Sequence, residues 1–337
     1  MSEEKTKNED NNIKRLEDLD LKDRKILLEL DKNSRLSVSR LAKMVGLSKE
    51  VTNYRVKRLI ASGVIKQFHT VFNVGALGYV SYRLLIKFRG ASPLLEKEMA
   101  EFFMASDIVQ AVFRAEGDYD LFVWVACREV NRFARLWEEF FMRYGNNIGG
   151  HRLSIFTSVD YYHRDYFVGR EREGTGVAFI STGQMQKTDE VDWSIMRLLA
   201  ADARIPTVEI ARRVGLVPKS VVRRIALLEE KGVIAGYRTL FDLEKLGILY
   251  YKIHFSLQEL APEVYKRFRT YVRTSPNAIY YNELIGGWDL EFEVQVRSGE
   301  ELASILADIK SRFGRHIREY HLLRYREELK YLFLPAA

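Results

Sequence analysis

Basic and polar side chains recur at helical spacing in two stretches, RLAKMVGLSKEVTNYRVKRLIASGVIK at 40–66 and EIARRVGLVPKSVVRRIALLEEKGVIA at 209–235. In the first stretch, Thr52, Val56 and Leu59 repeat at i, i+4 and i+7, which is typical of the buried face of a helix. The opposite face would present lysine, asparagine and tyrosine. Such a face can hydrogen-bond base edges in the major groove, while nearby lysine and arginine neutralise phosphates. These residues therefore predict binding to double-stranded DNA.

We expect both stretches to contribute DNA contacts. In the first stretch the candidates are Arg40, Lys43, Ser48, Lys49, Asn53, Tyr54, Lys57 and Arg58. In the second stretch they are Arg212, Arg213, Lys219, Ser220 and Arg223. The net charge is +6 between 19 and 65 but only +1 between 189 and 236, so the first stretch should hold DNA more tightly. Taken singly, each cation could equally belong to a solvated helix face, and Arg55 and Arg224 could pair with Asp23 or Asp192.

The elements that would position these residues form a helix-turn-helix. Gly46 interrupts a short helix, Ser48 is a good N-cap for the next helix, and Gly63 would end it. In the second stretch Val217 replaces the capping serine and Pro218 occupies the first helical turn. Three helices with a glycine turn before the last are typical of this motif.

The two stretches belong to a longer duplication. Residues 23–78 and 192–247 share 17 identities in 56 positions without a gap, at an offset of 169 residues. The same offset aligns GDYDL at 117–121 with GGWDL at 286–290. The duplicated unit is therefore about 150 residues long and covers most of the chain.

Each helical module is followed by alternating apolar residues, an amphipathic helix, two strands around the G-x-aromatic-Asp turn, a second helix and a last strand. This order predicts an α+β chain with two winged helix-turn-helix domains and two ferredoxin-like βαββαβ domains. The expected divisions are a flexible tail (1–18), helix-turn-helix 1 (19–66), ferredoxin-like domain 1 (67–167), a linker (168–188), helix-turn-helix 2 (189–235) and ferredoxin-like domain 2 (236–337).

Several motifs together resemble the Lrp/AsnC family of prokaryotic transcription regulators. They are D-x-x-I-L at 23–27, L-A-x-x-V-G-L-S at 41–48, R-V-x-x-L at 55–59, G-V-I at 63–65, L-G at 77–78, G-D-Y-D at 117–120 and G-W-D at 287–289. The resemblance covers about 20–165 and 189–334. It implies a regulator whose ferredoxin-like domain binds a small effector, commonly an amino acid, at the G-x-aromatic-Asp turns. This chain departs from the family in having two units, and in having Arg40 where the second copy has Glu209.

The implied effector residues are Gly117, Asp118, Tyr119, Asp120, Gly286, Gly287, Trp288 and Asp289. Backbone N–H groups of such a turn can bind a carboxylate and an aspartate can bind an ammonium, although the same residues could simply form tight strand connections.

A ferredoxin-like sheet has helices on one face only, so its open face needs a partner. A tethered second copy supplies one at high effective concentration, which predicts an intramolecular pseudo-dimer, with pairing between chains into a homo-oligomer as the rival. Arg83 and Lys87 would lie on the first copy's open face and Glu291 and Glu293 on the second copy's, so they could pair across copies or remain solvated.

Composition limits the class of protein, its localisation and its cofactors. The 337 residues are 47% apolar and 29% charged, with a net charge of +7, which is ordinary for a globular protein with a mild preference for polyanions. The lone Cys127, with no export signal and no long apolar run, predicts a cytoplasmic protein without a membrane span. No histidine or cysteine pattern predicts a metal, no cofactor is expected, and the chain is not expected to be an enzyme. Two alternatives stay open: an enzyme like the siroheme decarboxylases, which share this architecture, and a ligand-sensing partner that no longer binds DNA.

Overall fold

The structure is a computed structural model that describes residues 15–170, 172, 177–181, 184–259, 261–332 and 334–335, with only the backbone described for 177–181. Most of the expected N-terminal tail, residues 1–14, lies outside these ranges. Its last part forms a 3-10 turn, η1 (Leu16–Asp18). Leu16 is buried and its N–H donates to the Leu246 carbonyl at 2.9 Å, so residues 15–18 pack against the second copy.

The first helix-turn-helix is followed by a strand that leads into the sheet domain. Its elements are α2 (Leu21–Lys32), α3 (Val38–Val45), α4 (Lys49–Ala61) and β1 (Ile65–Phe72). The second copy repeats them as α7 (Glu190–Ala201), α8 (Thr207–Val214), α9 (Pro218–Glu230) and β7 (Ile234–Phe241). Asp20, Ser37 and Ser48 cap the three helices of the first copy, each accepting a backbone N–H in the first turn.

Both ferredoxin-like domains have the expected βαββαβ order. The first consists of β2 (Val80–Phe88), α5 (Pro93–Met104), β3 (Val109–Gly117), β4 (Leu121–Cys127), α6 (Val130–Tyr144), η2 (Gly145–Asn147) and β5 (Ile148–Tyr161). The second consists of β8 (Leu249–Leu257), α10 (Pro262–Thr274), β9 (Ala278–Ile285), β10 (Leu290–Val296), α11 (Gly299–Phe313), η4 (Gly314–His316) and β11 (Ile317–Tyr331). A short 3-10 turn, η3 (Asp165–Val168), follows the first ferredoxin-like domain. The segment expected as a linker contains a strand, β6 (Val177–Ser181), which pairs with β5.

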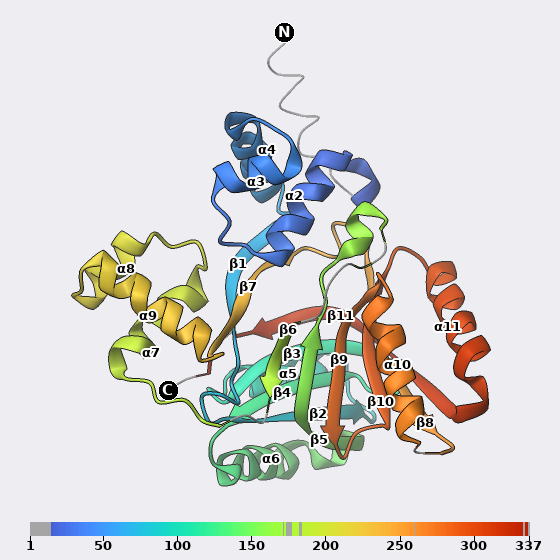
Figure 1. Cartoon of the computed structure of the whole chain (residues 1–337). Coiled ribbons are helices and arrows are strands. Elements are labelled where there is room, and N and C mark those ends of the chain that lie inside the picture. The colour runs from blue at the N-terminus through green and yellow to red at the C-terminus, as the bar shows by residue number, and fades with distance from the viewer. Residues whose placement is uncertain are drawn as a thin grey trace.

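The two sheets join edge to edge into a closed barrel. Among the described strands, the order is β2-β4-β3-β11-β8-β10-β9-β5, and β5 pairs back to β2. Counterparts in the two copies lie four places apart around this ring, so the pseudo-twofold axis that exchanges the copies runs along the barrel. The helices of each copy cover the outside of the barrel (Figure 1). The intramolecular pseudo-dimer is therefore present within one chain.

The barrel has different chemistry on its two surfaces. On β4, Leu121, Val123 and Val125 pack toward the outer helices, while Phe122 and Trp124 belong to the inner cluster. On β10, the inward positions are Glu291 and Glu293, which are buried. The solvated alternative for these two carboxylates is thus wrong, because strand pairing across the copies encloses the face on which they lie.

Strands β1 and β7 pair with each other outside the barrel and carry the helix-turn-helix domains at their ends (Figure 1). Each domain is fixed to the other copy's strand. Thr70 Oγ1 donates to the Leu199 carbonyl at 2.8 Å, and its counterpart Thr239 Oγ1 donates to the Leu30 carbonyl at 2.9 Å. A movement of this two-stranded ribbon therefore displaces both helical domains.

Within the described residues, no helix has the length and apolar character needed to cross a membrane. Cys127 is buried in the outer core of the first copy, where burial raises the pKa of its thiol.

Candidate nucleic-acid interface and effector cavity

The first helix-turn-helix is organised by its turn. Gly46 ends α3 with φ of 67°, a left-handed conformation that glycine adopts without steric cost. Ser48 Oγ then accepts the Val51 N–H at 3.2 Å, which starts α4. Thr52, Val56 and Leu59 are buried as expected, so the rotation of α4 about its axis is fixed by these residues.

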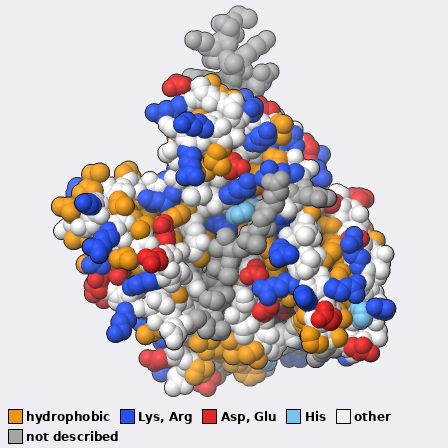
Figure 2. Space-filling model, viewed as in Figure 1, with side chains coloured by type: hydrophobic (Ala, Val, Ile, Leu, Met, Phe, Trp, Pro, Cys, Tyr) orange, Lys and Arg blue, Asp and Glu red, His pale blue; other side chains and the backbone are white. Residues whose placement is uncertain are grey.

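The outward face of α4 has the composition of a groove-reading surface. Lys49, Asn53, Tyr54 and Lys57 are all exposed, with Tyr54 at 58%. Arg40 and Lys43 are exposed on the neighbouring α3. Figure 2 shows lysine and arginine side chains spread over this domain, at the top of the view. The structure thus brings together most of the first copy's predicted DNA-binding residues on one accessible surface.

Two arginines of α4 hold the domain together. Arg55 Nη1 donates to Asp23 Oδ1 at 2.9 Å and to Asp20 Oδ2 at 2.7 Å. Arg58 also donates to Asp23, which is only 1% exposed. The structural interpretation of Arg55 is confirmed. Arg58, by contrast, was a candidate for DNA contact, and the structure gives it a partner inside the domain.

The second helix-turn-helix presents different chemistry. The counterparts of Lys49, Asn53 and Lys57 at the offset of 169 are Pro218, Val222 and Ala226. Lys219 and Arg223 are exposed on α9, but Ser220 is half-buried and the exposed face includes Val222 at 56%. The structure therefore brings fewer polar groups to the outward face of α9 than to that of α4.

Other cations of the second domain are already paired. Arg212 and Arg213 on α8 both donate to Glu209, at 2.8 Å and 2.6 Å. The hydrogen bonds from Arg212 and Arg213 lower the pKa of Glu209 to about 2, so it stays ionised at neutral pH. Arg224 donates to Asp189 and Asp192, which repeats the Arg55 arrangement. Pairing thus further reduces the positive potential of the second domain.

A cavity of about 640 Å³ opens at one end of the barrel, where the two G-x-aromatic-Asp turns meet; we call it the axial cavity. Its walls are Lys87, Asp118, Tyr119, Gly149, Gly150, Arg152, Ser256, Gly287, Trp288, Asp289, Arg318, Glu319 and His321. Nearly every residue here has its counterpart at the offset of 169 in the same wall. The cavity therefore lies on the pseudo-twofold axis, and there is one such site for the pair of copies.

Duplication followed by divergence has made this cavity asymmetric. Tyr119 faces its counterpart Trp288, with ring centres 6.2 Å apart. Across the axis, counterparts differ in charge: Lys87 corresponds to Ser256, Asp118 to Gly287, Arg152 to His321, and the neutral Gly149 to Arg318. Two orientations of a small ligand are therefore not equivalent in this cavity.

The structure divides the predicted effector residues into two groups. Asp118, Tyr119, Gly287, Trp288 and Asp289 line the cavity. The others shape the turns. Gly117 and Gly286 take φ of 122° and 79°. Asp120 Oδ2 accepts the Phe88 N–H at 2.7 Å, as Asp289 Oδ2 accepts the N–H of Leu257, and these bonds tie each turn to the first strand of its sheet.

Charged residues of the last strands complete the cavity and were missed by sequence reasoning. Arg152 belongs to β5, while Arg318, Glu319 and His321 belong to β11. His321 Nδ1 lies 2.5 Å from Asp118 Oδ2 of the other copy. The repeat offset of 169 residues, which relates Arg152 to His321, was the sequence signal that could have identified them. Only strand pairing between the copies brings these strand ends next to the turns.

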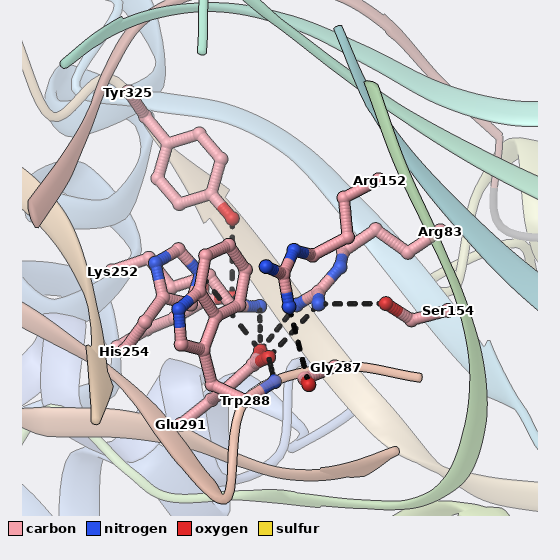
Figure 3. Close-up of polar contacts among 10 residues, drawn as sticks. Arg83, Arg152, Ser154, Lys252, His254, Gly287, Trp288, Glu291 and Tyr325 are labelled. Carbon is pink, nitrogen blue, oxygen red and sulfur yellow. Dashed lines mark hydrogen bonds and ion pairs between the residues drawn. The ribbon is translucent and has the colours of Figure 1, made fainter. Parts of the chain in front are cut away.

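Beneath the cavity, a buried group of charges fills the middle of the barrel (Figure 3). Arg83 donates two hydrogen bonds to Glu291, one of them from Nη2 to Oε1 at 2.8 Å. Lys252 Nζ donates to Glu293 Oε1 at 3.0 Å. The cross-copy pairing of Arg83 with Glu291 is therefore confirmed. Lys87 instead pairs with Asp120 of its own copy, and the expectation that it reaches the second copy's carboxylates is wrong.

The buried charges also contact the cavity wall. Glu291 Oε1 accepts the Trp288 N–H at 3.1 Å, and the Trp288 ring stacks on His254 at 3.9 Å. Burial alone would raise the pKa of Glu291, but the charge of Arg83, with that of Lys252, overrides burial and holds the pKa well below its usual range. A ligand that moves Trp288 would therefore act on an ionised pair in the barrel core.

Comparison with known families matches both helical domains. Residues 19–66 match a winged helix-turn-helix DNA-binding model, and residues 189–229 match an AsnC-type helix-turn-helix domain. Together with the barrel, this defines a tandem protein of the helix-turn-helix regulator class with ferredoxin-like domains.

Named relatives narrow that class. The chain is 32% identical over 143 residues to the HTH-type transcriptional regulator AldR of Mycolicibacterium smegmatis, covering 40% of this chain and 84% of that protein. It is 31% identical over 121 residues to the proline dehydrogenase transcriptional activator of Rhodobacter capsulatus, covering 36% and 79%. The chain belongs to the Lrp/AsnC family of transcriptional regulators.

A solved structure shares the whole tandem arrangement. The siroheme decarboxylase NirDL superimposes with a TM-score of 0.63 over 93% of this chain and 94% of that chain, at 16% sequence identity. At this identity the similarity establishes the fold.

Proposed function

We propose that this chain regulates transcription in the cytoplasm by binding double-stranded DNA, with α4 as the main groove-reading helix and a small effector in the axial cavity as the signal. The observation that carries the proposal is the exposed row of Lys49, Asn53, Tyr54 and Lys57 on the third helix of a helix-turn-helix. Asparagine can hydrogen-bond adenine in the major groove and lysine neutralises phosphate.

The axial cavity supports an amino-acid effector. Arg152 and Arg318 can bind a carboxylate, Glu319 can accept hydrogen bonds from an ammonium group, and Trp288 with Tyr119 offers an aromatic wall for a side chain. Because the cavity lies on the pseudo-twofold axis, we expect one effector molecule per chain.

Genome-wide mapping of the chain's binding sites in its host tests the proposal, followed by anisotropy titration of the recovered duplex with full-length protein. We expect the logarithm of the association constant to fall linearly with the logarithm of salt concentration. Reversing Lys49 and Lys57 to glutamate should weaken binding, whereas reversing Lys266, exposed on the outer helix α10, should not. Absence of salt-dependent binding to any duplex would refute DNA binding by the chain and leave a ligand-sensing partner as its role.

A second candidate is an enzyme of the siroheme decarboxylase type, which the whole-chain similarity to NirDL supports. The relatives by sequence bear regulator names, so we propose that this chain is not an enzyme. Incubation with siroheme and detection of released carbon dioxide tests this directly. Release that depends on the intact chain would replace the regulator proposal.

A further inference from the structure

A second cavity, of about 630 Å³, occupies the opposite end of the barrel, under the β1–β7 ribbon. Like the axial cavity, it lies on the pseudo-twofold axis. Its wall contains two pairs of counterparts, His69 with Arg238 and Trp124 with Glu293. Glu293 also belongs to the buried charges below the first cavity, which therefore separate the two spaces.

Aromatic rings form much of this second cavity. They come from strands of both copies and are Phe113, Phe122, Trp124, Phe156, Tyr161 and Tyr280 together with Tyr250, Tyr325 and Tyr331. Such a wall offers flat apolar surface for stacking, and the volume lies in the range of small-molecule sites.

One buried arginine of the cavity has a donor nitrogen without a hydrogen-bond acceptor among the described residues. Arg238 is 4% exposed and its guanidinium carbon lies 3.1 Å from the centre of the Tyr161 ring. Among the described residues, its Nη1 has no hydrogen-bond partner. A buried guanidinium is costly unless an anion accompanies it, so this nitrogen indicates a missing acceptor.

The nearby carboxylate is already occupied. Asp31 Oδ1 accepts from Arg164 Nη1 at 2.6 Å and from the Tyr161 hydroxyl at 2.7 Å, while Oδ2 accepts the Arg164 N–H at 2.8 Å. Burial lowers the pKa of His69 to about 3 and that of His163 to about 4, so both are neutral at pH 7. This cluster of Asp31, Arg164 and Arg238 thus holds two cations against one anion.

A second donor points to the same kind of ligand. Asn282 is 4% exposed, lines the cavity, and its Nδ2 has no hydrogen-bond partner among the described residues. Two buried donors within an aromatic wall suit the oxygens of a carboxylate attached to a ring system. We propose that this cavity binds a planar aromatic carboxylate, with its anionic group on Arg238.

The position of the site couples such a ligand to the helical domains through the β1–β7 ribbon. Arg238 precedes Thr239 on β7, and the Thr239 hydroxyl holds the Leu30 carbonyl at the end of α2. His69 and Thr70 have the same relation on β1. A ligand bound here would therefore contact the ribbon that carries both helix-turn-helix domains. This site is distinct from the axial cavity.

Calorimetric titration of the full-length chain with 2-naphthoate tests the proposal, with neutral 2-naphthamide as the matched ligand. We expect one molecule of the acid per chain and binding of the amide weaker by about tenfold or more, the usual range for a charged hydrogen bond. Arg238→Gln should reduce binding of the acid by a similar factor. Arg312→Gln, at an exposed arginine of α11 that pairs with Asp308 and does not line this cavity, should leave it within twofold.

Tryptophan fluorescence can show which of the two cavities the ligand occupies, in an experiment that needs no DNA. Trp124 lines this cavity and Trp288 lines the other, so quenching by 2-naphthoate should disappear in Trp124→Phe and persist in Trp288→Phe. Uroporphyrin III serves as the large planar anion. Arg238-dependent binding of uroporphyrin alone would identify a tetrapyrrole as the aromatic carboxylate. Equal binding of acid and amide, quenching through Trp288, or binding of neither anion would overturn the proposal.

Discussion

Arg83 of the first copy donates two hydrogen bonds to the Glu291 carboxylate of the second, and both side chains are fully buried in the barrel. At the offset of 169, the counterpart of Arg83 is Lys252 and that of Glu291 is Phe122. An exact twofold axis would repeat this ion pair, but the counterpart residues cannot form it, so the Arg83–Glu291 pair occurs once. It distinguishes the two copies and favours pairing of a first copy with a second.

Breaking this pair should destabilise the chain strongly. In Glu291→Leu the Arg83 guanidinium loses its carboxylate while it remains buried, so we expect the free energy of unfolding to fall by about 3–5 kcal/mol. The double variant Arg83→Met/Glu291→Leu removes both charges and leaves Lys252 with Glu293, so it should recover more than half of the loss. Urea unfolding followed by circular dichroism measures both values. A double variant no more stable than the single one would contradict this account.

The ribbon bonds provide a matched test of how each helical domain is anchored. Thr70→Val and Thr239→Val each remove one buried hydroxyl that holds the other copy's helix end. Each should lower the free energy of unfolding by about 1 kcal/mol. Thr270→Val serves as the control, because Thr270 is exposed and its hydroxyl donates to the Lys266 carbonyl of its own helix. It should change stability by less than about 0.5 kcal/mol. A control loss as large as either ribbon loss would argue against a special role for these bonds.

Acid should destabilise the chain in the range where histidines titrate. His69 and His163 are neutral in the fold, with pKa values of about 3 and about 4 against an ordinary value of 6.5, because burial disfavours their charged forms. Below pH 6.5 the unfolded chain binds protons that the folded chain does not, so stability falls as pH falls toward 4. Each histidine contributes up to about 1.4 kcal/mol per pH unit in that window. His69→Gln should give a shallower slope of unfolding free energy between pH 6.5 and 4, and an unchanged slope would be inconsistent with a neutral buried His69.

Much of the architecture could be predicted from the sequence because it follows local patterns. The Gly46 turn, the Ser48 cap and the period of Thr52, Val56 and Leu59 fix the recognition helix, and the period-two runs fix the strands. The fixed offset indicated two equivalent units. The turn, cap and period signals act over a few residues, and the structure confirms the fold class that they predicted together with the repeat.

The walls of both cavities could not be predicted in the same way. His321 meets Asp118 only after β11 of the second copy pairs with β3 of the first copy in the barrel. Arg238 of β7 meets Tyr161 of β5 only when the β1–β7 ribbon packs against the barrel. Such contacts depend on the register between distant strands, which carries no local sequence signal.

The two recognition helices should contribute unequally to DNA binding. Lys49→Glu/Lys57→Glu should weaken binding of the mapped duplex by tenfold or more (about 1.4 kcal/mol or more), and reduce the slope of log affinity against log salt by about one for each phosphate that is no longer neutralised. Lys219→Glu/Arg223→Glu makes the same charge change on α9, whose face also exposes Val222, and should cost less. Anisotropy titrations at two or more salt concentrations decide between them. Equal losses would show that both helices hold DNA alike.

The position of the axial cavity predicts the stoichiometry of the proposed effector. Because Tyr119 and Trp288 meet across the pseudo-twofold axis and line one cavity, a ligand bound against them fills the site for both copies. Calorimetry against a panel of amino acids should therefore give one molecule per chain for those that bind. Arg152→Gln should weaken binding of the amino acid but not of the corresponding cationic amine that lacks the carboxylate. The Arg152 guanidinium carbon lies 4.1 Å from the centre of the Trp288 ring at the cavity wall, where it can meet the carboxylate. Leu153→Gln, exposed at the neighbouring position, is the control. Two equivalent molecules per chain would place the effector in the separate copies instead of on their shared axis.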